Sequence, residues 1–366
     1  MKTRMKTRDN MMTFDGSYRS IDSKGNQLGR PLGNSFKTSD GRTVDSTGAF
    51  LVGELERLDL TLHEPLVDVS WGRDIDLRED VTMADEVSSF TLSTFASAGG
   101  LGTANGIGSG KAWIGKDTNQ ITGQSVDIAK IPHQLRPWGQ ELKYTILELE
   151  SAAKLGRPID VQKYQAMQLK YQMDIDEQVY IGDTTMGDTG LVNNSLVTNV
   201  SNLPNGVGGS PKWTLKTADE IVSDVNFMLT GTWQNSAWAV MPGRLMLPPA
   251  LFGYISSQKV SSAGNVSILK YIQENNILTT SGQGKLEIYP LKWLIGAGAG
   301  GTIGTLGTVD RAIVYTKAKN RVRYPMTMLQ STPIQYDSIY HKTTYFCRLG
   351  AVEVVYPETL GYFDGL

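Results

Sequence analysis

Cysteine and histidine are scarce in this sequence. Cys347 is the only cysteine, so the chain cannot form an internal disulfide or build a zinc site from several thiolates. The histidines His63, His133 and His341 lie far apart, unlike the paired ligands of a metal site. We expect each histidine to be a loop or interface residue. Cys347 lies in an aromatic, strand-like run, and we expect a buried, inert thiol there.

Long apolar runs and an excess of charge are also missing. No run approaches the ~18 apolar residues of a membrane-spanning helix. A net charge of −2 argues against a dedicated nucleic-acid binder, which usually carries a strong basic excess. Hydrophobic residues make up 40% of the chain and charged residues 20%, which excludes a disordered protein. At 366 residues, the chain is long enough for two domains with buried cores.

Catalytic motifs are absent as well. We find no nucleophile elbow, no H-E-x-x-H and no phosphate-binding P-loop. The stretch Gly296–Gly301 fits G-x-G-x-x-G after a predicted strand, but neither a helix start nor an acidic residue about 20 positions on follows it. We interpret this stretch as a mobile loop, and we assign no catalytic, cofactor-binding or metal-binding residue.

Acidic residues cluster twice, and we interpret both clusters as solvated or inter-subunit faces. A carboxylate pair of the glycosidase type stays open for them. The two clusters are Asp74, Asp76, Glu79 and Asp80, and Asp174, Asp176 and Glu177.

Glycine, in contrast, is plentiful, with 39 residues, and six of the fifteen residues from 96 to 110 are glycine. Strand-like alternation precedes this stretch at 87–95, and strand candidates follow it at 111–115 and 125–131. The pattern predicts a long projecting β-hairpin over 85–136. A lone hairpin is marginal in water, so it needs a surface to lie on. Its predicted tip comprises Gly99, Gly100, Gly102, Gly106, Gly108, Gly110 and Lys111.

Residues 1–48 differ in composition from the rest. They hold only 11 hydrophobic residues, and nine Lys or Arg stand against five Asp, giving +4. Such a segment cannot bury a core of its own. It is either a disordered tail or an arm that becomes ordered on a neighbouring subunit. Its basic start is a solvated tail or, repeated over many copies, a salt-dependent contact with packaged nucleic acid. The basic residues are Lys2, Arg4, Lys6 and Arg8.

Helix signals are strongest in the middle of the chain. Thr145 and Glu148 form a capping box before an apolar face that ends near Leu155. Asp160 is placed to cap a longer helix reaching about residue 181. We also expect a short helix at 49–58. The apolar stripe of the longer helix is Val161, Tyr164, Met167, Tyr171, Ile175 and Val179.

The second half of the chain reads as mixed α/β packing followed by strands. Thr217 and Glu220 form another capping box. Further helices are predicted at 249–256 and 266–275, and a glycine-rich loop at 296–308. The predicted strands are 238–241, 286–294, 312–315, 322–324, 344–349 and 352–356.

This order of parts resembles the major capsid proteins of tailed bacteriophages, the Hong Kong 97-type fold shared with encapsulins. The run 147–156 leads into the long helix as in that family, and 176–183 closes it. Thr189-Gly-Leu-Val-Asn193 resembles the turn after the family's spine helix, and Ala351–Pro357 its closing strand. The resemblance spans residues 50–366, and the ordered set carries it more than any single motif.

The resemblance implies an α+β fold with named parts. Residues 1–48 correspond to the extended N-terminal arm, and 49–84 to the start of the peripheral (P) domain. Residues 85–136 correspond to the E-loop hairpin. The other parts are the P-domain with a spine helix at about 160–181 (137–212), the axial (A) domain (213–308), and the C-terminal strands returning to the P-domain (309–366).

The function implied by the resemblance is structural, not enzymatic, and needs no cofactor. Copies of the chain would form hexamers and pentamers of an icosahedral shell around the double-stranded DNA of a tailed phage, assembled in the host bacterial cytoplasm. Residues 1–48 look too short for a built-in scaffolding segment, so a separate scaffolding protein is expected beside a portal. The DNA would be contacted weakly and without sequence specificity. A decoration protein is compatible with this role, and no membrane is involved.

Other functions remain alternatives. The chain could form an encapsulin-type nanocompartment shell, which belongs to the same structural class. From other classes come a hydrolase with a glycine-loop active site and a secreted adhesin. Three scattered histidines argue against the hydrolase, and the helix-rich middle argues against the adhesin.

Overall fold

The computed structural model describes residues 13–14, 20–21, 66–97, 124–155, 159–260, 265–299, 307 and 309–366. The chain divides into two compact units, Met1–Pro65 and Leu66–Leu366. In the first unit, β1 (Thr13–Phe14) pairs antiparallel with β2 (Ser20–Ile21). The predicted helix at 49–58, the basic start and the glycine-rich hairpin tip lie outside the described residues.

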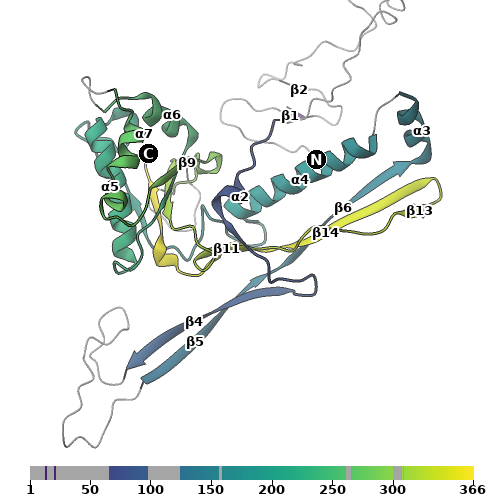
Figure 1. Cartoon of the computed structure of the whole chain (residues 1–366), viewed down its shortest axis with the longest axis horizontal. Coiled ribbons are helices and arrows are strands. Elements are labelled where there is room, and N and C mark those ends of the chain that lie inside the picture. Colours follow the sequence, from purple (N-terminus) through teal and green to yellow (C-terminus); the bar gives the residue numbers. More distant parts are fainter. Residues whose placement is uncertain are drawn as a thin grey trace, which may run out of the picture. The chain divides into compact units, whose positions relative to one another are not determined.

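A five-stranded sheet forms one half of the second unit (Figure 1). Its central strand β10 pairs antiparallel with both β16 and β8, while β7 and β9 join the two edges in parallel. Every residue of β8, β10 and β16 is buried, as expected for strands covered on both faces. In sheet order, the strands are β7 (Val200–Asn202), β16 (Leu360–Asp364), β10 (Arg311–Tyr315), β8 (Arg244–Leu247) and β9 (Glu287–Pro290).

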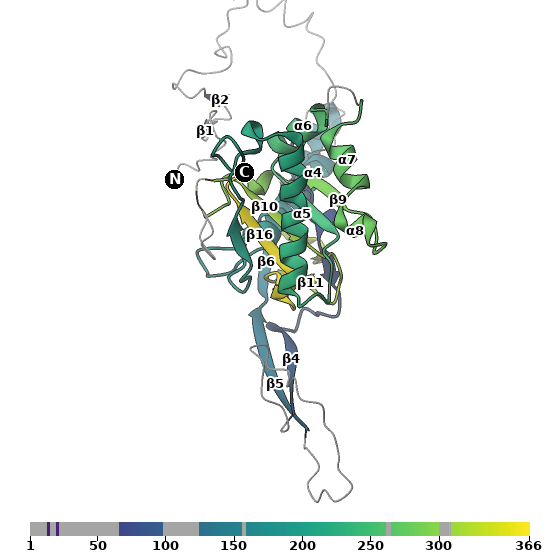
Figure 2. The same cartoon turned by 90° about the vertical axis from the view of Figure 1, so that its left-hand side faces the viewer.

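Helices cover one face of this sheet, and Figure 2 shows α5 running across it. Alternate residues of β10 divide between two cores. Ala312 and Val314 pack with the helices, whereas Ile313 and Tyr315 pack with α4 and its neighbours. The covering helices are α5 (Ala218–Asn235), α6 (Pro249–Ser257), α7 (Ile268–Glu274) and α8 (Ile277–Thr280). Short 3₁₀ turns lie at Trp213–Leu215, Lys292–Leu294 and Pro357–Thr359.

A long two-stranded ladder and helix α4 form the other half (Figure 1). Strands β6 (Arg136–Thr145) and β14 (Tyr340–Leu349) pair antiparallel over ten residues, and α4 (Ile159–Tyr180) packs against β6. Helix α3 (Ile146–Leu155) joins β6 to the approach to α4. The short strands β12 (Gln330–Ser331) and β13 (Gln335–Asp337) pair with the other edge of β14.

A small sheet and a separate hairpin complete the described part. Strand β11 (Val322–Pro325) lies between β15 (Glu353–Val354) and β3 (Asp76–Arg78), which follows the short helix α2 (Trp71–Asp74). Strands β4 (Val87–Ser97) and β5 (Gln124–Gln134) pair antiparallel along eleven residues and extend away from both larger sheets (Figures 1 and 2). The predicted hairpin is confirmed where its strands are described; the strand candidate at 111–115 lies outside those residues.

Both predicted capping boxes are confirmed. Thr145 and Glu148 exchange backbone-to-side-chain hydrogen bonds of 3.1 Å in each direction, and Thr217 and Glu220 cap α5 in the same way. The prediction for Asp160 is wrong, because α4 begins at Ile159 and Asp160 lies within its first turn. There its charge still favours the positive end of the helix dipole.

Two strand predictions also need correction. Residues 238–241 are not a strand: Ala237 and Trp238 have positive φ values of 52° and 63°, and the strand β8 starts only at Arg244. Trp238 is 52% exposed, so its apolar side chain does not mark a buried strand. The predicted strand 286–294 stops at Pro290, after which the chain turns into a 3₁₀ helix.

The predicted stripe of α4 is buried only in part. Met167, Tyr171, Ile175 and Val179 are buried, as predicted. Val161 and Tyr164 are exposed on the described chain because the first turns of α4 extend beyond the cores that bury its second half.

Candidate assembly elements

The β4–β5 hairpin exposes apolar side chains on strands that have no further neighbour among the described residues. Residues paired across an antiparallel ladder share one face. One face carries Val126, 52% exposed, and Ile128, 66% exposed, with Val87 of β4 on the same face at 50%. Ala129, on the other face, is also exposed. A two-stranded ribbon with this surface is marginal in water and gains stability from a covering partner.

The root of the hairpin, where β4 begins and β5 ends, is held by a buried carboxylate, Glu353 of β15. Its side chain is fully buried and accepts hydrogen bonds from Arg78 Nη1 (3.1 Å), from Arg323 Nε (2.6 Å) and from the Ser88 hydroxyl. Arg78 also donates to the Ser89 carbonyl at 3.0 Å. A buried charge needs paired, hydrogen-bonded partners, and Glu353 has them from three strands. This Glu353 cluster therefore sets the direction in which the hairpin leaves the body.

His133 lies directly across the ladder from Ser88, on the same face as the Glu353 cluster. Its ring stacks on Phe90 with a centroid distance of 5.8 Å and an interplanar angle of 17°. The Nε2 atom is buried without a hydrogen-bond partner. Burial lowers the pKa of His133 from its ordinary value of 6.5, against the attraction of Glu353 and Asp188.

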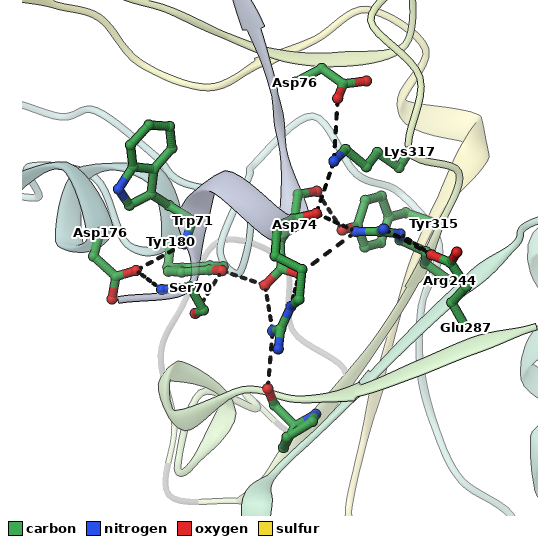
Figure 3. Close-up of polar contacts among 12 residues, drawn as sticks. Ser70, Trp71, Asp74, Asp76, Asp176, Tyr180, Arg244, Glu287, Tyr315 and Lys317 are labelled. Atoms are coloured by element: carbon green, nitrogen blue, oxygen red, sulfur yellow. Dashed lines mark hydrogen bonds and ion pairs between the residues drawn. The ribbon is translucent and has the colours of Figure 1, made fainter. Parts of the chain in front are cut away.

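A second polar cluster joins α4 to the five-stranded sheet through the segment 70–76 (Figure 3). The Asp74 carboxylate is fully buried and accepts hydrogen bonds from Arg73 Nε at 2.6 Å and from the Tyr180 hydroxyl at 2.5 Å. The Tyr315 hydroxyl of β10 donates to the Asp74 carbonyl at 2.7 Å, and Arg244 of β8 donates to the Arg73 carbonyl at 2.7 Å. This Asp74 cluster thus connects α2, the end of α4 and two sheet strands.

Asp176 forms the neighbouring junction. It is 1% exposed, and its Oδ1 accepts the backbone N–H groups of Ser70 (3.0 Å) and Trp71 (3.2 Å). Its Oδ2 accepts the Trp293 indole N–H at 2.7 Å and lies 3.2 Å from Lys292 Nζ. One carboxylate thereby ties together three segments that are distant in the sequence.

Both acidic clusters therefore correct the sequence prediction. Asp74 and Asp176 were expected on solvated or inter-subunit faces, but each is buried inside this chain. Asp80 and Glu177 are exposed, as predicted. Sequence reasoning also missed Glu353, Arg78 and Arg244. The one available signal was Glu353 itself, a lone acid within the apolar run Ala351–Val355.

These polar clusters suit a structural role better than catalysis. Burial raises the pKa of the Tyr180 and Tyr315 hydroxyls, with a further rise from Asp74, so both stay protonated and weakly nucleophilic. Across the described ranges, no three His, Cys, Asp or Glu side chains come together in a way that could hold a metal ion. No described helix has the length and apolar character needed to cross a membrane.

Three sequence candidates remain: Cys347, the histidines and the glycine motif. Cys347 is buried, as predicted, and burial raises its pKa to about 11. His133 and His341 both lie in strands, β5 and β14, rather than in loops. In the glycine motif, Gly296 N–H donates to Asp310 at 2.8 Å, and Gly298 forms an isolated bridge with Val309; residues 300–306 and 308 lie outside the described chain.

The comparisons with known proteins agree with this architecture. A family model described as "Major capsid protein" matches residues 110–366. The capsid of the myovirus phage XM1 superposes with a TM-score of 0.64 at 16% identity, covering 86% of this chain and 98% of that one. The capsid of a native GTA particle superposes with a TM-score of 0.52 at 11% identity, covering 88% and 97%. A comparison with curated proteins finds no match.

The fold is thus a mixed α+β fold of the kind found in phage capsids. The chain belongs to the major capsid protein family. It is therefore a structural, non-enzymatic protein of a capsid.

Proposed function

We propose that this chain is the shell subunit of a tailed bacteriophage, forming hexamers and pentamers of an icosahedral capsid around double-stranded DNA. Within the subunit, β4–β5 is the E-loop, α4 is the spine helix of the P-domain, and the five-stranded sheet with α5–α8 belongs to the A-domain. The parts keep the boundaries predicted from the sequence: arm 1–48, P-domain start 49–84, E-loop 85–136, P-domain 137–212, A-domain 213–308 and returning strands 309–366.

One observation carries the proposal: the β4–β5 hairpin presents Val126 and Ile128 to solvent, while the cluster around the fully buried Glu353 fixes its root. Exposed apolar residues on a rigidly mounted ribbon are what a neighbouring copy can cover. Many such contacts around a closed shell add up through multivalency, so no single contact has to be strong.

The partners follow from this role. The glycine-rich tip, from Gly99 to Lys111, would adjust the hairpin to five-fold and six-fold surroundings. The basic residues Lys2, Arg4, Lys6 and Arg8 would contact packaged DNA weakly, without sequence specificity. Assembly would take place in the host bacterial cytoplasm with a separate scaffolding protein and a portal, and a decoration protein is compatible with the outer surface.

Electron microscopy of the purified full-length chain tests the proposal. We expect closed shells or capsomer rings from the wild-type chain and their loss from the double variant Val126→Asp and Ile128→Asp. Ala129→Asp is the matched control, because it places the same charge on the opposite face of the same strand. Wild-type chains that stay monomeric, or a double variant that assembles like the control, would contradict the proposal. The DNA content of purified particles then separates a phage shell or GTA particle from an encapsulin-type compartment.

A further inference from the structure

His133 is the only described histidine at the hairpin root, and its position there is unusual for an ionisable group. The described strands β4 and β5 are largely exposed beyond the root, whereas Ser88, Phe90 and Leu135 are buried. His133 is itself half-buried, with its Nε2 atom buried and its ring against Phe90. The packed position of the hairpin root, which we call its seat, therefore depends on a side chain that can change its charge near neutral pH.

A neutral imidazole fits this seat, and an imidazolium does not. Both ring nitrogens of an imidazolium carry a proton and need acceptors. Nε2 is buried and makes no hydrogen bond. Protonation would therefore leave a buried, charged donor unpaired at Nε2, which is strongly unfavourable.

The surrounding charges do not offset this penalty. Glu353 of β15 and Asp188 of the turn after α4 both attract a positive charge at His133. Glu353 is already bound by Arg78 and Arg323. Asp188 is paired with Arg136 at 2.8 Å, and Arg348 lies nearby with Nη1 3.4 Å from the Leu135 carbonyl. Three arginines, Arg78, Arg323 and Arg136, thus pair with the two carboxylates, and burial decides the outcome.

We propose that the root of the β4–β5 hairpin is an acid-sensitive latch, in which protonation of His133 releases the hairpin from its seat between Phe90 and the Glu353 cluster. At neutral pH the stacked imidazole holds the hairpin in one direction. In mild acid the imidazolium leaves the buried seat for water and the hairpin can reorient. This latch would regulate the shell contact described above, so its biological role rests on the proposed function, although the latch itself is a property of the single chain.

The direction of the pH dependence follows from the lowered pKa of His133. Above the ordinary value of 6.5, the imidazole is neutral whether the latch is closed or open, and the closed form has its full stability. Below 6.5, the open form takes up a proton first, so the closed form loses stability until the pH reaches the lowered pKa. The ratio of closed to open form falls tenfold for each unit that separates the two pKa values.

Hydrogen exchange of the full-length chain, followed by mass spectrometry at about pH 7.5 and about pH 5, tests the latch in the range where histidine titrates. After correction for the intrinsic pH dependence of exchange, we expect root peptides from β4 and β5 to lose protection in acid, while β10 stays protected. His133→Phe keeps an aromatic ring without a titratable group and should abolish the change. His133→Gln should also abolish it, with weaker protection at both pH values, and His341→Gln should retain the wild-type response.

The latch is wrong if the wild-type root keeps its protection in acid, if His133→Phe still responds, or if the response disappears in His341→Gln instead. Assembly at neutral pH reports separately on the proposed function. If the wild-type chain forms shells but its root peptides keep the same protection at both pH values, only the latch is contradicted. If the root peptides lose protection in acid but the Val126→Asp and Ile128→Asp double variant still forms shells, only the proposed contact of this hairpin face with a neighbouring copy is contradicted.

Discussion

Arg311 and Asp364 face each other across the β10–β16 ladder and form an ion pair with no exposed surface on either side chain. Arg311 Nε donates to one carboxylate oxygen at 2.6 Å and Nη2 to the other at 2.9 Å, while Nη1 donates to the Val192 carbonyl. The pair therefore anchors the last strand of the chain to the centre of the sheet and to the turn that follows α4.

Asp364→Asn should destabilise the chain strongly, because it leaves the Arg311 charge buried without its counter-ion. Breaking such a pair costs about 3–5 kcal/mol. Asp337→Asn is the matched control, since Asp337 pairs with Lys342 at an exposed site and such pairs contribute about 0–1 kcal/mol. Denaturant unfolding of both variants measures the difference. Equal unfolding midpoints would show that the buried pair is not the anchor.

Asp176→Ala should also destabilise the chain, by a few kcal/mol, since it removes the acceptor for two backbone N–H groups and the Trp293 indole. Denaturant unfolding followed by tryptophan fluorescence measures this loss of stability. Glu177→Gln, at the exposed neighbouring position on α4, should leave stability within about 0.5 kcal/mol of wild type. A similar loss from both variants would argue for a general effect of α4 charge instead of the junction.

Gly190→Ala should prevent correct folding or lower the melting temperature sharply. A Cβ at this position would lie 2.3 Å from the carbonyl carbon and oxygen of Tyr180, and backbone atoms cannot move aside locally. Gly253→Ala is the control, because open space surrounds Gly253 within helix α6 and alanine favours helices. The control should match or slightly exceed wild-type stability in a thermal melt. A Gly190→Ala chain that melts like wild type would refute the close approach.

Cys347 should resist thiol reagents in the folded chain. Burial raises its pKa to about 11, so at pH ~8 the thiolate is scarce and inaccessible. Labelling with a colourimetric thiol reagent should be slow in buffer and reach one thiol per chain in guanidinium chloride. Fast labelling of the folded chain would show that β14 opens locally.

Local patterns predicted much of the secondary structure. The capping boxes at Thr145 and Thr217 depend on side chains three residues apart, so they form wherever the helix forms. The alternation at 87–95 and the period of α4 likewise reflect which face of one element is apolar. The strand predicted at 238–241 failed because apolar residues in a tight, left-handed turn look like a short buried strand.

The buried acids could not be predicted in this way. Asp74 and Asp176 lie in charged or mixed segments and Glu353 in an apolar run, but the partners of these acids are up to 275 residues away in the sequence. Whether a carboxylate is solvated or buried depends on which distant arginine, tryptophan or tyrosine the fold brings to it. This depends on which two distant segments come into contact, and a local sequence pattern describes only one of them.

The amino-acid sequence alone determined most of the elements, their order along the chain, the projecting hairpin and the likeness to capsid proteins. These features depend on local periodicity, capping and glycine. Only the tertiary structure decided that carboxylates hold the junctions of α4 and the hairpin root, and that His133 lies unpaired in that root. Burial and pairing arise when distant segments meet, and they determine the energy of a charge far more than its neighbours in the chain do.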